Sequence, residues 1–77
     1  MNGRLGDVSG RDIVRALQKA GFVIKRIRGS HHILVHVRDR SRRATVPVHG
    51  GASLKRGTLR SILKQAELTE DELRPLL

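Results

Sequence analysis

The 77-residue sequence contains no cysteine, tryptophan or tyrosine, and only one phenylalanine and two prolines. Without cysteine the chain can form neither a disulfide framework nor a thiolate metal site, and it has no thiol nucleophile. Without tyrosine and tryptophan it lacks the platforms on which many RNA-binding proteins stack unpaired bases. Any contact with nucleic acid must therefore depend mainly on charge, so we expect weak sequence preference and strong salt dependence.

Long apolar runs are also missing. No segment approaches the roughly 20 apolar residues that a membrane-spanning helix needs, and the N-terminal stretch MNGRLGDVSG lacks the apolar segment of a signal peptide. We therefore predict a cytoplasmic protein that makes no membrane contact. The length corresponds to a single small domain over residues 1–77, in which residues 1–8 are predicted to form a flexible leader.

Acidic residues are scarce in the middle of the chain. The sequence has 16 lysine and arginine residues against 7 aspartate and glutamate residues, a formal net charge of +9. Between Phe22 and Lys64, eleven basic residues and one acidic residue, Asp39, give a local net charge of +10. A protein with such a field concentrates polyanions and gains affinity by releasing their counterions. The pattern favours a nucleic-acid partner over a merely solubilising surface.

Helical periodicity and capping signals mark the helices. In VSGRDIVRALQKAG, Ser9 is a predicted N-cap with Asp12 as its capping-box partner, and Gly21 is a predicted stop. A second helix is predicted from position 54 or 57 through GTLRSILKQAEL, with Thr58 as a candidate cap. TEDEL, near the C-terminus, has the spacing of another capping box and predicts a last short helix or turn.

Three β-branched segments lie between the two main helices. They are FVIKRIR at residues 22–28, HHILVHV at 31–37 and ATVPVH at 44–49. Pro47 cannot donate a ladder hydrogen bond, so the third strand is predicted to lie at a sheet edge. Short connections favour an antiparallel meander, and both helices must cover one face of it. The predicted fold is α+β in the order α-β-β-β-α, with a three-stranded antiparallel sheet, two helices on one face and the other face open.

The stretch RGSHHILVH gathers three of the four histidines. His31 and His32 are neighbours and would point to opposite faces of a strand, whereas His32 and His36 would share a face about 13 Å apart at roughly 3.3 Å per residue. Neither spacing brings two imidazoles onto one metal ion, and carboxylates are scarce nearby. We predict no metal site, which leaves packing and acid–base chemistry as explanations.

Hairpin geometry suggests a catalytic arrangement. We take Arg38 to pair with Arg43 across a four-residue loop. His49 then comes opposite His32, within two residues of register, and close to His31. Beside a bound RNA phosphodiester, one imidazole would take the proton of the 2′-hydroxyl and a cation would stabilise the charge on phosphorus. A second imidazole or a water would protonate the leaving oxygen.

A packing explanation remains open beside this one. Ile33, Val35 and Val37 alternate as a candidate core face, and strict strand parity places His31 with them. A histidine of that parity is more often partly buried than catalytic. His36 shares the other face, where we expect it to be solvated.

Several motifs together resemble a known family. The helix ending in AGF, followed by RGSHHILVH, VPVHGG, LKRGTLRSILKQAEL and TEDEL, is similar in order and spacing to the HicA (YcfA-type) toxins of bacterial toxin–antitoxin pairs over about residues 9–73. The resemblance implies a fold like the double-stranded RNA-binding domain. It also implies an mRNA interferase, an endoribonuclease that cuts messages without a metal or other cofactor. Its catalytic residue would be the histidine of the Gly-Ser-His segment, here His31, with His32 as second choice because two histidines follow the Gly-Ser pair.

The resemblance also implies a partner, a HicB antitoxin that covers the active surface. It does not assign the general acid, so His49 as a catalytic helper rests on our hairpin register alone. Our candidate RNA contacts are Arg28, Ser30, Lys55 and Arg56, the last two at the predicted start of a helix, where backbone amides favour phosphate. The alternative function is a non-catalytic RNA-binding module of the same fold, and a third interpretation is a basic surface made for an acidic partner protein.

Overall fold

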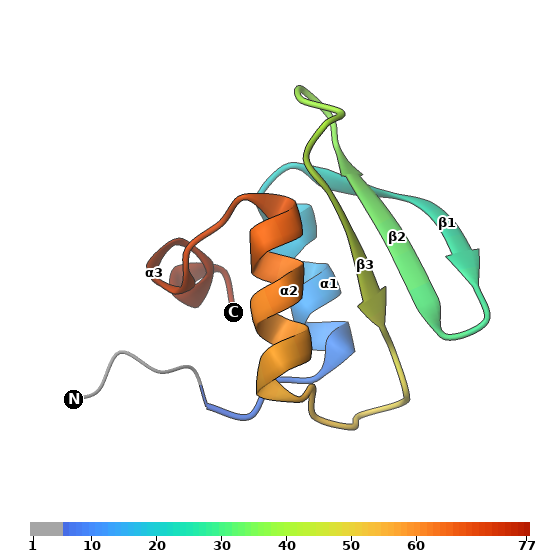
Figure 1. Cartoon of the computed structure of the whole chain (residues 1–77), viewed down its shortest axis with the longest axis vertical. Helices are drawn as coiled ribbons and strands as arrows, with labels where there is room; N and C mark the ends of the chain where they lie inside the picture. Colours follow the sequence, from blue (N-terminus) through green and yellow to red (C-terminus); the bar gives the residue numbers. More distant parts are fainter. Residues whose placement is uncertain (1–5) are drawn as a thin grey trace.

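The computed structural model describes residues 6–77 of the chain. In chain order the elements are α1 (Gly10–Lys19), β1 (Phe22–Arg28), β2 (His31–His36), β3 (Arg43–Pro47), α2 (Arg56–Ala66), α3 (Glu70–Leu73) and η1, a short 3-10 turn (Arg74–Leu76). The strands form an antiparallel sheet in the order β1-β2-β3, and α1 and α2 lie on one side of it (Figure 1). The predicted α+β class and α-β-β-β-α order are confirmed.

The predicted leader, residues 1–8, lies largely outside the described residues, which begin at position 6. Its last residue, Val8, packs against the core, and its carbonyl accepts a hydrogen bond of 2.7 Å from the Leu54 N–H. Ser9 then forms an isolated antiparallel bridge with Ser53. These contacts tie the start of α1 to the segment that precedes α2.

Both predicted capping boxes are present. The Ser9 hydroxyl accepts a hydrogen bond from the Asp12 N–H at 3.1 Å, while the Asp12 carboxylate accepts one from the Ser9 N–H at 3.2 Å. Thr69 and Glu72 make the same reciprocal pair at the start of α3. After α1 the chain turns at Gly21, whose φ of 102° lies in the region that only glycine adopts readily. The cap and stop residues therefore set the limits of α1, as predicted.

The core lies between the sheet and the two long helices. Phe22, Leu34, Ala44 and Val46 enter it from the strands, each at most 1% exposed. The helical side chains that meet them are Ile13, Val14, Ala16, Leu17, Leu59, Ile62, Leu63, Ala66 and Leu73. Figure 1 shows α2 beside β3, with β1 as the strand farthest from α2. Side chains on the helix-facing side of β1 are consequently less covered, and Ile24 and Ile27 remain 38% and 55% exposed.

The predicted core face of β2 is wrong. Leu34 is fully buried, whereas Ile33 and Val35 are half-buried on the opposite face and Val37 is 57% exposed beyond the strand. The segment Ile33–Val37 is apolar at four of its five positions, so alternation alone does not say which parity faces the helices. His31 shares the parity of Ile33 and therefore lies on the open face.

The predicted register of the β2–β3 hairpin is also wrong. Arg43 pairs with Val35 instead of Arg38, three residues away, and His32 lies opposite Val46 instead of His49. The connection between the two strands is six residues long, 37–42, and its last residue, Arg42, accepts a hydrogen bond of 2.9 Å from the His36 N–H at its carbonyl. Within it, the Asp39 carboxylate accepts hydrogen bonds from the Ser41 hydroxyl and N–H at 2.6 and 3.1 Å. A six-residue connection that the Asp39 side chain stabilises is thus found in place of the predicted four-residue loop.

The second helix begins earlier than its candidate cap. Lys55 is the N-cap of α2 and makes no side-chain capping bond, so Thr58 lies inside the helix and the prediction that it caps the helix is wrong. The bond between Leu54 and Val8 fixes the chain just before this point, and the helix follows at once. Pro47, in contrast, ends β3 at a sheet edge, as predicted.

Candidate active site

The open face of the sheet is the face turned away from α1 and α2. Strand register assigns to it alternating residues of each strand, which are Val23, Arg26, Arg28, His31, Ile33, Val35, Arg43, Thr45 and Pro47. Basic side chains flank β2 on both neighbouring strands. The β1 strand carries a bulge at Lys25, where the register shifts between Ile24 and Arg26. The open face therefore combines an apolar centre with cations on either side.

His31 begins β2 at one end of this face. It is exposed, and its direct neighbours across the sheet are Arg28 on β1 and Pro47 on β3. The turn that precedes it is held by Gly29, with a φ of 58°, and by a hydrogen bond of 2.7 Å from the Val48 N–H to the Ser30 carbonyl. Directly opposed residues in an antiparallel pair have Cβ atoms about 4.5–5.5 Å apart. The Arg28 side chain therefore begins within reach of any anion bound at His31.

His32 lies on the other side of the same strand. Its cross-strand partners are Ile27 and Val46, both on the helix-facing side, and its Nδ1 atom is buried without a hydrogen-bond partner among the described residues. A proton acceptor has to come within hydrogen-bond reach of the group from which it takes the proton. Of the two neighbouring histidines, His31 is the one on the surface that a polymer can reach.

His36 has a structural position, contrary to the prediction that it is solvated. Its ring is half-buried and meets Phe22 edge to face, with the two ring centroids 5.0 Å apart. Nδ1 accepts a hydrogen bond of 3.1 Å from the Arg38 N–H, so the neutral ring carries its proton on Nε2, which donates to the Ala20 carbonyl at 3.2 Å. These contacts join the end of β2 to the end of α1.

His49 lies at the same end of the sheet as His31 but beyond β3. It is exposed and follows Val48, whose N–H extends the ladder to Ser30. Its carbonyl then accepts the Ala52 N–H at 3.0 Å in the turn that leaves the sheet. The structure thus keeps the two histidines at one end, although His49 is not opposite His32 as the predicted register required.

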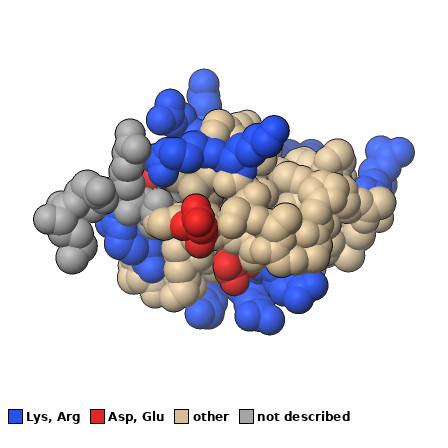
Figure 2. Space-filling view, turned by 90° about the horizontal axis from the view of Figure 1, so that it is seen from below, with Lys and Arg blue, Asp and Glu red and all other residues tan. Residues whose placement is uncertain are grey.

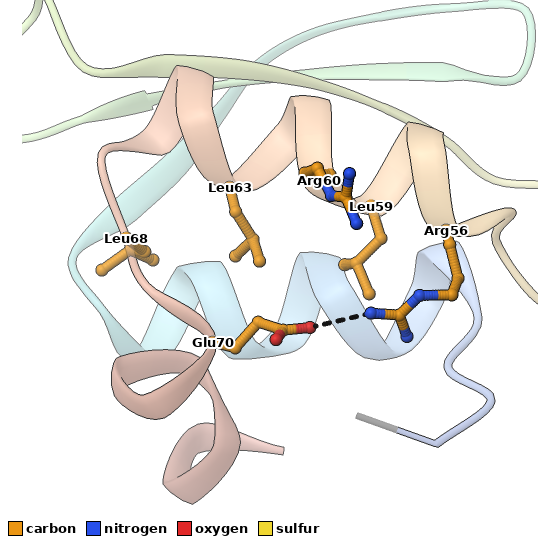
Figure 3. A pocket seen from close by; sticks show the side chains of 6 residues that line it. All are labelled: Arg56, Leu59, Arg60, Leu63, Leu68 and Glu70. Carbon is orange, nitrogen blue, oxygen red and sulfur yellow. Dashed lines mark hydrogen bonds and ion pairs between the residues drawn. The ribbon is translucent and has the colours of Figure 1, made fainter. Parts of the chain in front are cut away.

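The predicted RNA contacts fall on different parts of the molecule. Arg28 lies on the open face, and Ser30 is half-buried in the adjoining turn. Lys55 is exposed at the N-terminus of α2. Arg56 contacts Glu70 at 3.5 Å across a pocket whose floor contains Leu59, Leu63 and Leu68, and Figure 3 shows the Arg56 side chain leaving α2 on the side away from the sheet, toward Glu70. Arg56 therefore belongs to the helical layer and not to the open face.

Basic side chains also surround the end of the molecule seen in Figure 2. In that view they flank a surface made mostly of other residues, and acidic side chains occupy a small part of it. Among the acidic residues, Asp12 serves the cap of α1 and Asp39 serves the β2–β3 turn. Backbone and side-chain hydrogen bonds from Ser9 lower the pKa of Asp12, and hydrogen bonds from the Ser41 hydroxyl and N–H lower the pKa of Asp39.

Two kinds of feature are absent from residues 6–77. No group of three or more histidine, aspartate or glutamate side chains among residues 6–77 could hold a metal ion. In the same part of the chain, no helix has the length and apolarity needed to cross a bilayer.

The chain matches a known protein family. A family model described as "HicA toxin of bacterial toxin-antitoxin" matches residues 10–68, more than half of the chain. The matched span runs from the first residue of α1, through all three strands and α2, to Leu68, and it contains the four histidines. No curated protein matches the chain.

Proposed function

The chain belongs to the HicA toxin family of bacterial toxin–antitoxin systems, and from this premise we propose that it is an endoribonuclease that cleaves messenger RNA without a metal ion. The observation that carries the proposal is the position of His31. It is exposed, follows the Gly29-Ser30 turn directly, and lies beside Arg28 on the open face. A proton acceptor and a fixed cation are thereby next to each other on a surface wide enough for a polymer.

The proposed reaction uses the nucleophile that RNA itself carries. His31 takes the proton of a 2′-hydroxyl, and the 2′-oxygen forms a bond to the adjacent phosphorus as the bond to the 5′-oxygen breaks. Arg28 stabilises the negative charge that develops on the phosphoryl oxygens. The products are a 2′,3′-cyclic phosphate and a 5′-hydroxyl. Because the attacking group belongs to the substrate, no metal-bound water is needed as nucleophile.

The leaving 5′-oxygen needs a proton, and we propose His49 as its donor. His49 follows Val48, whose N–H bonds to the Ser30 carbonyl, and stands two residues beyond Pro47, the direct cross-strand partner of His31. This place at the same end of the sheet as His31 supports the role. His49→Ala should slow cleavage while leaving RNA affinity nearly unchanged, and an unaltered cleavage rate would remove His49 from the mechanism.

RNA binding is proposed to depend on Arg28, Ser30, Lys55 and Arg56. Arg28 and Ser30 adjoin His31, and Lys55 stands where the backbone amides of α2 are free to meet phosphate. Arg56 would have to exchange its contact with Glu70 for one with phosphate. Its contribution should accordingly be the smallest of the three cations.

The family further implies an antitoxin partner. We propose that this partner is of the HicB type, acts with the toxin in the cytoplasm, and covers the surface around His31. An acidic protein surface would match the basic surroundings of that face. Native mass spectrometry of the co-expressed pair should find a complex, and its absence would count against this part of the proposal.

One observation favours a non-catalytic RNA-binding module instead. No described residue makes a hydrogen bond to the His31 ring, whereas a catalytic imidazole is commonly oriented by a partner. The test is to incubate the purified protein with messenger RNA in EDTA, beside His31→Ala and His32→Ala. Cleavage by the parent and by His32→Ala, with His31→Ala inactive but still binding RNA, supports the ribonuclease. Binding without cleavage by all three proteins identifies an RNA-binding module.

A further inference from the structure

The open face carries a second feature at the end opposite His31. A shallow groove, here called the valine groove, is lined by Val23, Lys25, Val35, His36, Val37 and Arg40. Val23 and Val35 form a cross-strand pair, and strand alternation places Val35 on the same face as His31. Val35 and His31 are four positions apart along β2, which corresponds to about 13 Å at roughly 3.3 Å per residue. One extended ligand could therefore occupy both places.

The groove has an apolar floor and a cationic rim. Val23 is 50% exposed and Val37 is 57% exposed, so its floor presents much of its apolar surface to water. Lys25 stands on the β1 bulge and Arg40 in the β2–β3 connection, and no acidic side chain of residues 6–77 lines the groove. An exposed apolar patch framed by charge is typical of a binding site. Its ligand should carry an apolar surface and negative charge close together.

We propose that the valine groove is a subsite for a base of single-stranded RNA, a few nucleotides from the phosphate held at His31. This inference rests on the proposed function, because it extends the path of the same substrate along β2. A nucleotide matches the groove in both respects, since the face of its base packs on the valines and its phosphate meets Lys25 or Arg40. Because the groove continues the face on which His31 and Arg28 are proposed to hold an RNA phosphate, the same RNA strand can reach it, and RNA is therefore taken as its occupant.

The groove has little means of reading base identity. The two nitrogens of His36 are already used by the Ala20 carbonyl and the Arg38 N–H. The Val37 N–H is bound to the Gly21 carbonyl at 3.0 Å. Apolar contact favours a nucleotide that has a base over an abasic one, but it discriminates weakly between the four bases. The subsite should therefore increase the affinity for single-stranded RNA by binding a base at a fixed distance from the cut, without selecting which base it is.

The test measures binding and not cleavage. His31→Ala protein is titrated with a short single-stranded RNA while valine methyl resonances are recorded, and the titration is repeated with RNAs that lack one base at successive positions. We expect the methyls of Val23, Val35 and Val37 to shift and those of buried Val46 to stay. Removal of the base at one position should abolish those shifts and weaken binding about fivefold, because apolar burial is lost there.

Variants of exposed residues provide the matched control. Val23→Ser and Val37→Ser should each weaken binding of the complete RNA about threefold, whereas Ile27→Ser, equally exposed but on the helix-facing side, should not change it. Shifts confined to the His31 end, or equal affinity for every base-deleted RNA, would overturn the subsite while leaving the ribonuclease proposal intact. Shifts caused by an acidic peptide but not by RNA would overturn it in favour of a protein ligand. Failure to bind RNA at all would contradict both proposals.

Discussion

His31 and His32 are adjacent in the sequence and opposite in environment. His31 is exposed beside Arg28, and His32 has a buried Nδ1 beneath the sheet. Family resemblance alone left a choice between them as the catalytic candidate because two histidines follow the Gly-Ser pair. Strand alternation put them on opposite faces from the sequence alone, but it did not say which face is open, because apolar residues occupy both faces of β2. Only the packing of Leu34 against the helices fixes which side is open.

A tight contact at Gly10 leads to a prediction for a second single residue, on the stability of the fold. A Cβ atom there would overlap the Pro47 carbonyl oxygen and lie 3.2 Å from the Val48 Cα, and neither backbone atom can move aside easily. Gly10→Ala should therefore lower the free energy of unfolding by about 1–3 kcal/mol, as overpacking typically does.

The matched control is Gly57→Ala in α2. A Cβ atom at Gly57 would meet nothing within 4 Å, so alanine should stabilise the helix by about 0.5–1 kcal/mol. Urea denaturation of both variants measures the two changes. Equal effects of the two substitutions would show that the approach of α1 to the end of β3 is not close.

At the scale of elements, the helices, the strands and their antiparallel order follow from local signals, but the register between β2 and β3 does not. The capping boxes at Ser9 and Thr69 and the limits of β1 were predictable because each depends on neighbouring residues. The β2–β3 register depends on the Asp39–Ser41 turn, whose hydrogen bonds lengthen the connection to six residues. Because β2 ends at His36, Val37 lies outside the strand and is exposed instead of facing the core. The valine groove could therefore not be predicted from the sequence.

The α1 capping box gives a pH-dependent prediction. Hydrogen bonds from Ser9 lower the pKa of Asp12 below its ordinary value of 3.8. Because the folded-state pKa lies below that of the unfolded chain, the carboxylate stabilises the fold above pH 3.8, and this contribution is lost as the pH falls through the lowered value. Asp12→Asn should be less stable than the parent at neutral pH, and urea midpoints should show the difference closing in acid. A difference that persists unchanged in acid would contradict a role for the charge.

At the scale of the whole molecule, charge was predictable in amount but not in placement. The net charge of +9 is evident from composition, yet the structure divides the cations between the open face and the helical layer, where Arg56 pairs with Glu70. The sequence favours Arg56 over Arg28 as an RNA contact because Arg56 stands at a predicted helix start, whereas the structure puts Arg28 beside His31 and pairs Arg56 with Glu70. A basic sequence therefore indicated a polyanion partner without indicating where it lies.

The salt dependence of RNA affinity should distinguish the cations of the open face from those of the helical layer. For single-stranded RNA the slope of log affinity against log salt changes by about 0.7 for each phosphate contact. Arg28→Ala should reduce the slope by about that amount, since Arg28 lies beside His31 on the open face. Arg15→Ala, on the exposed side of α1, should leave it unchanged. Fluorescence anisotropy over a range of salt concentrations measures both, and equal slopes for the two variants would argue against binding on the open face.

The most direct test of the proposed mechanism is single-turnover cleavage in EDTA of an RNA and of the same RNA with one 2′-deoxynucleotide at the cut. We expect the parent protein to leave a 2′,3′-cyclic phosphate on the RNA and not to cut the substituted substrate at that position. We also expect His31→Ala, still folded and binding RNA, to be slower by about 10²- to 10⁴-fold because it has lost the general base. Cleavage of the 2′-deoxy position, or a His31→Ala rate equal to that of the parent, would contradict it.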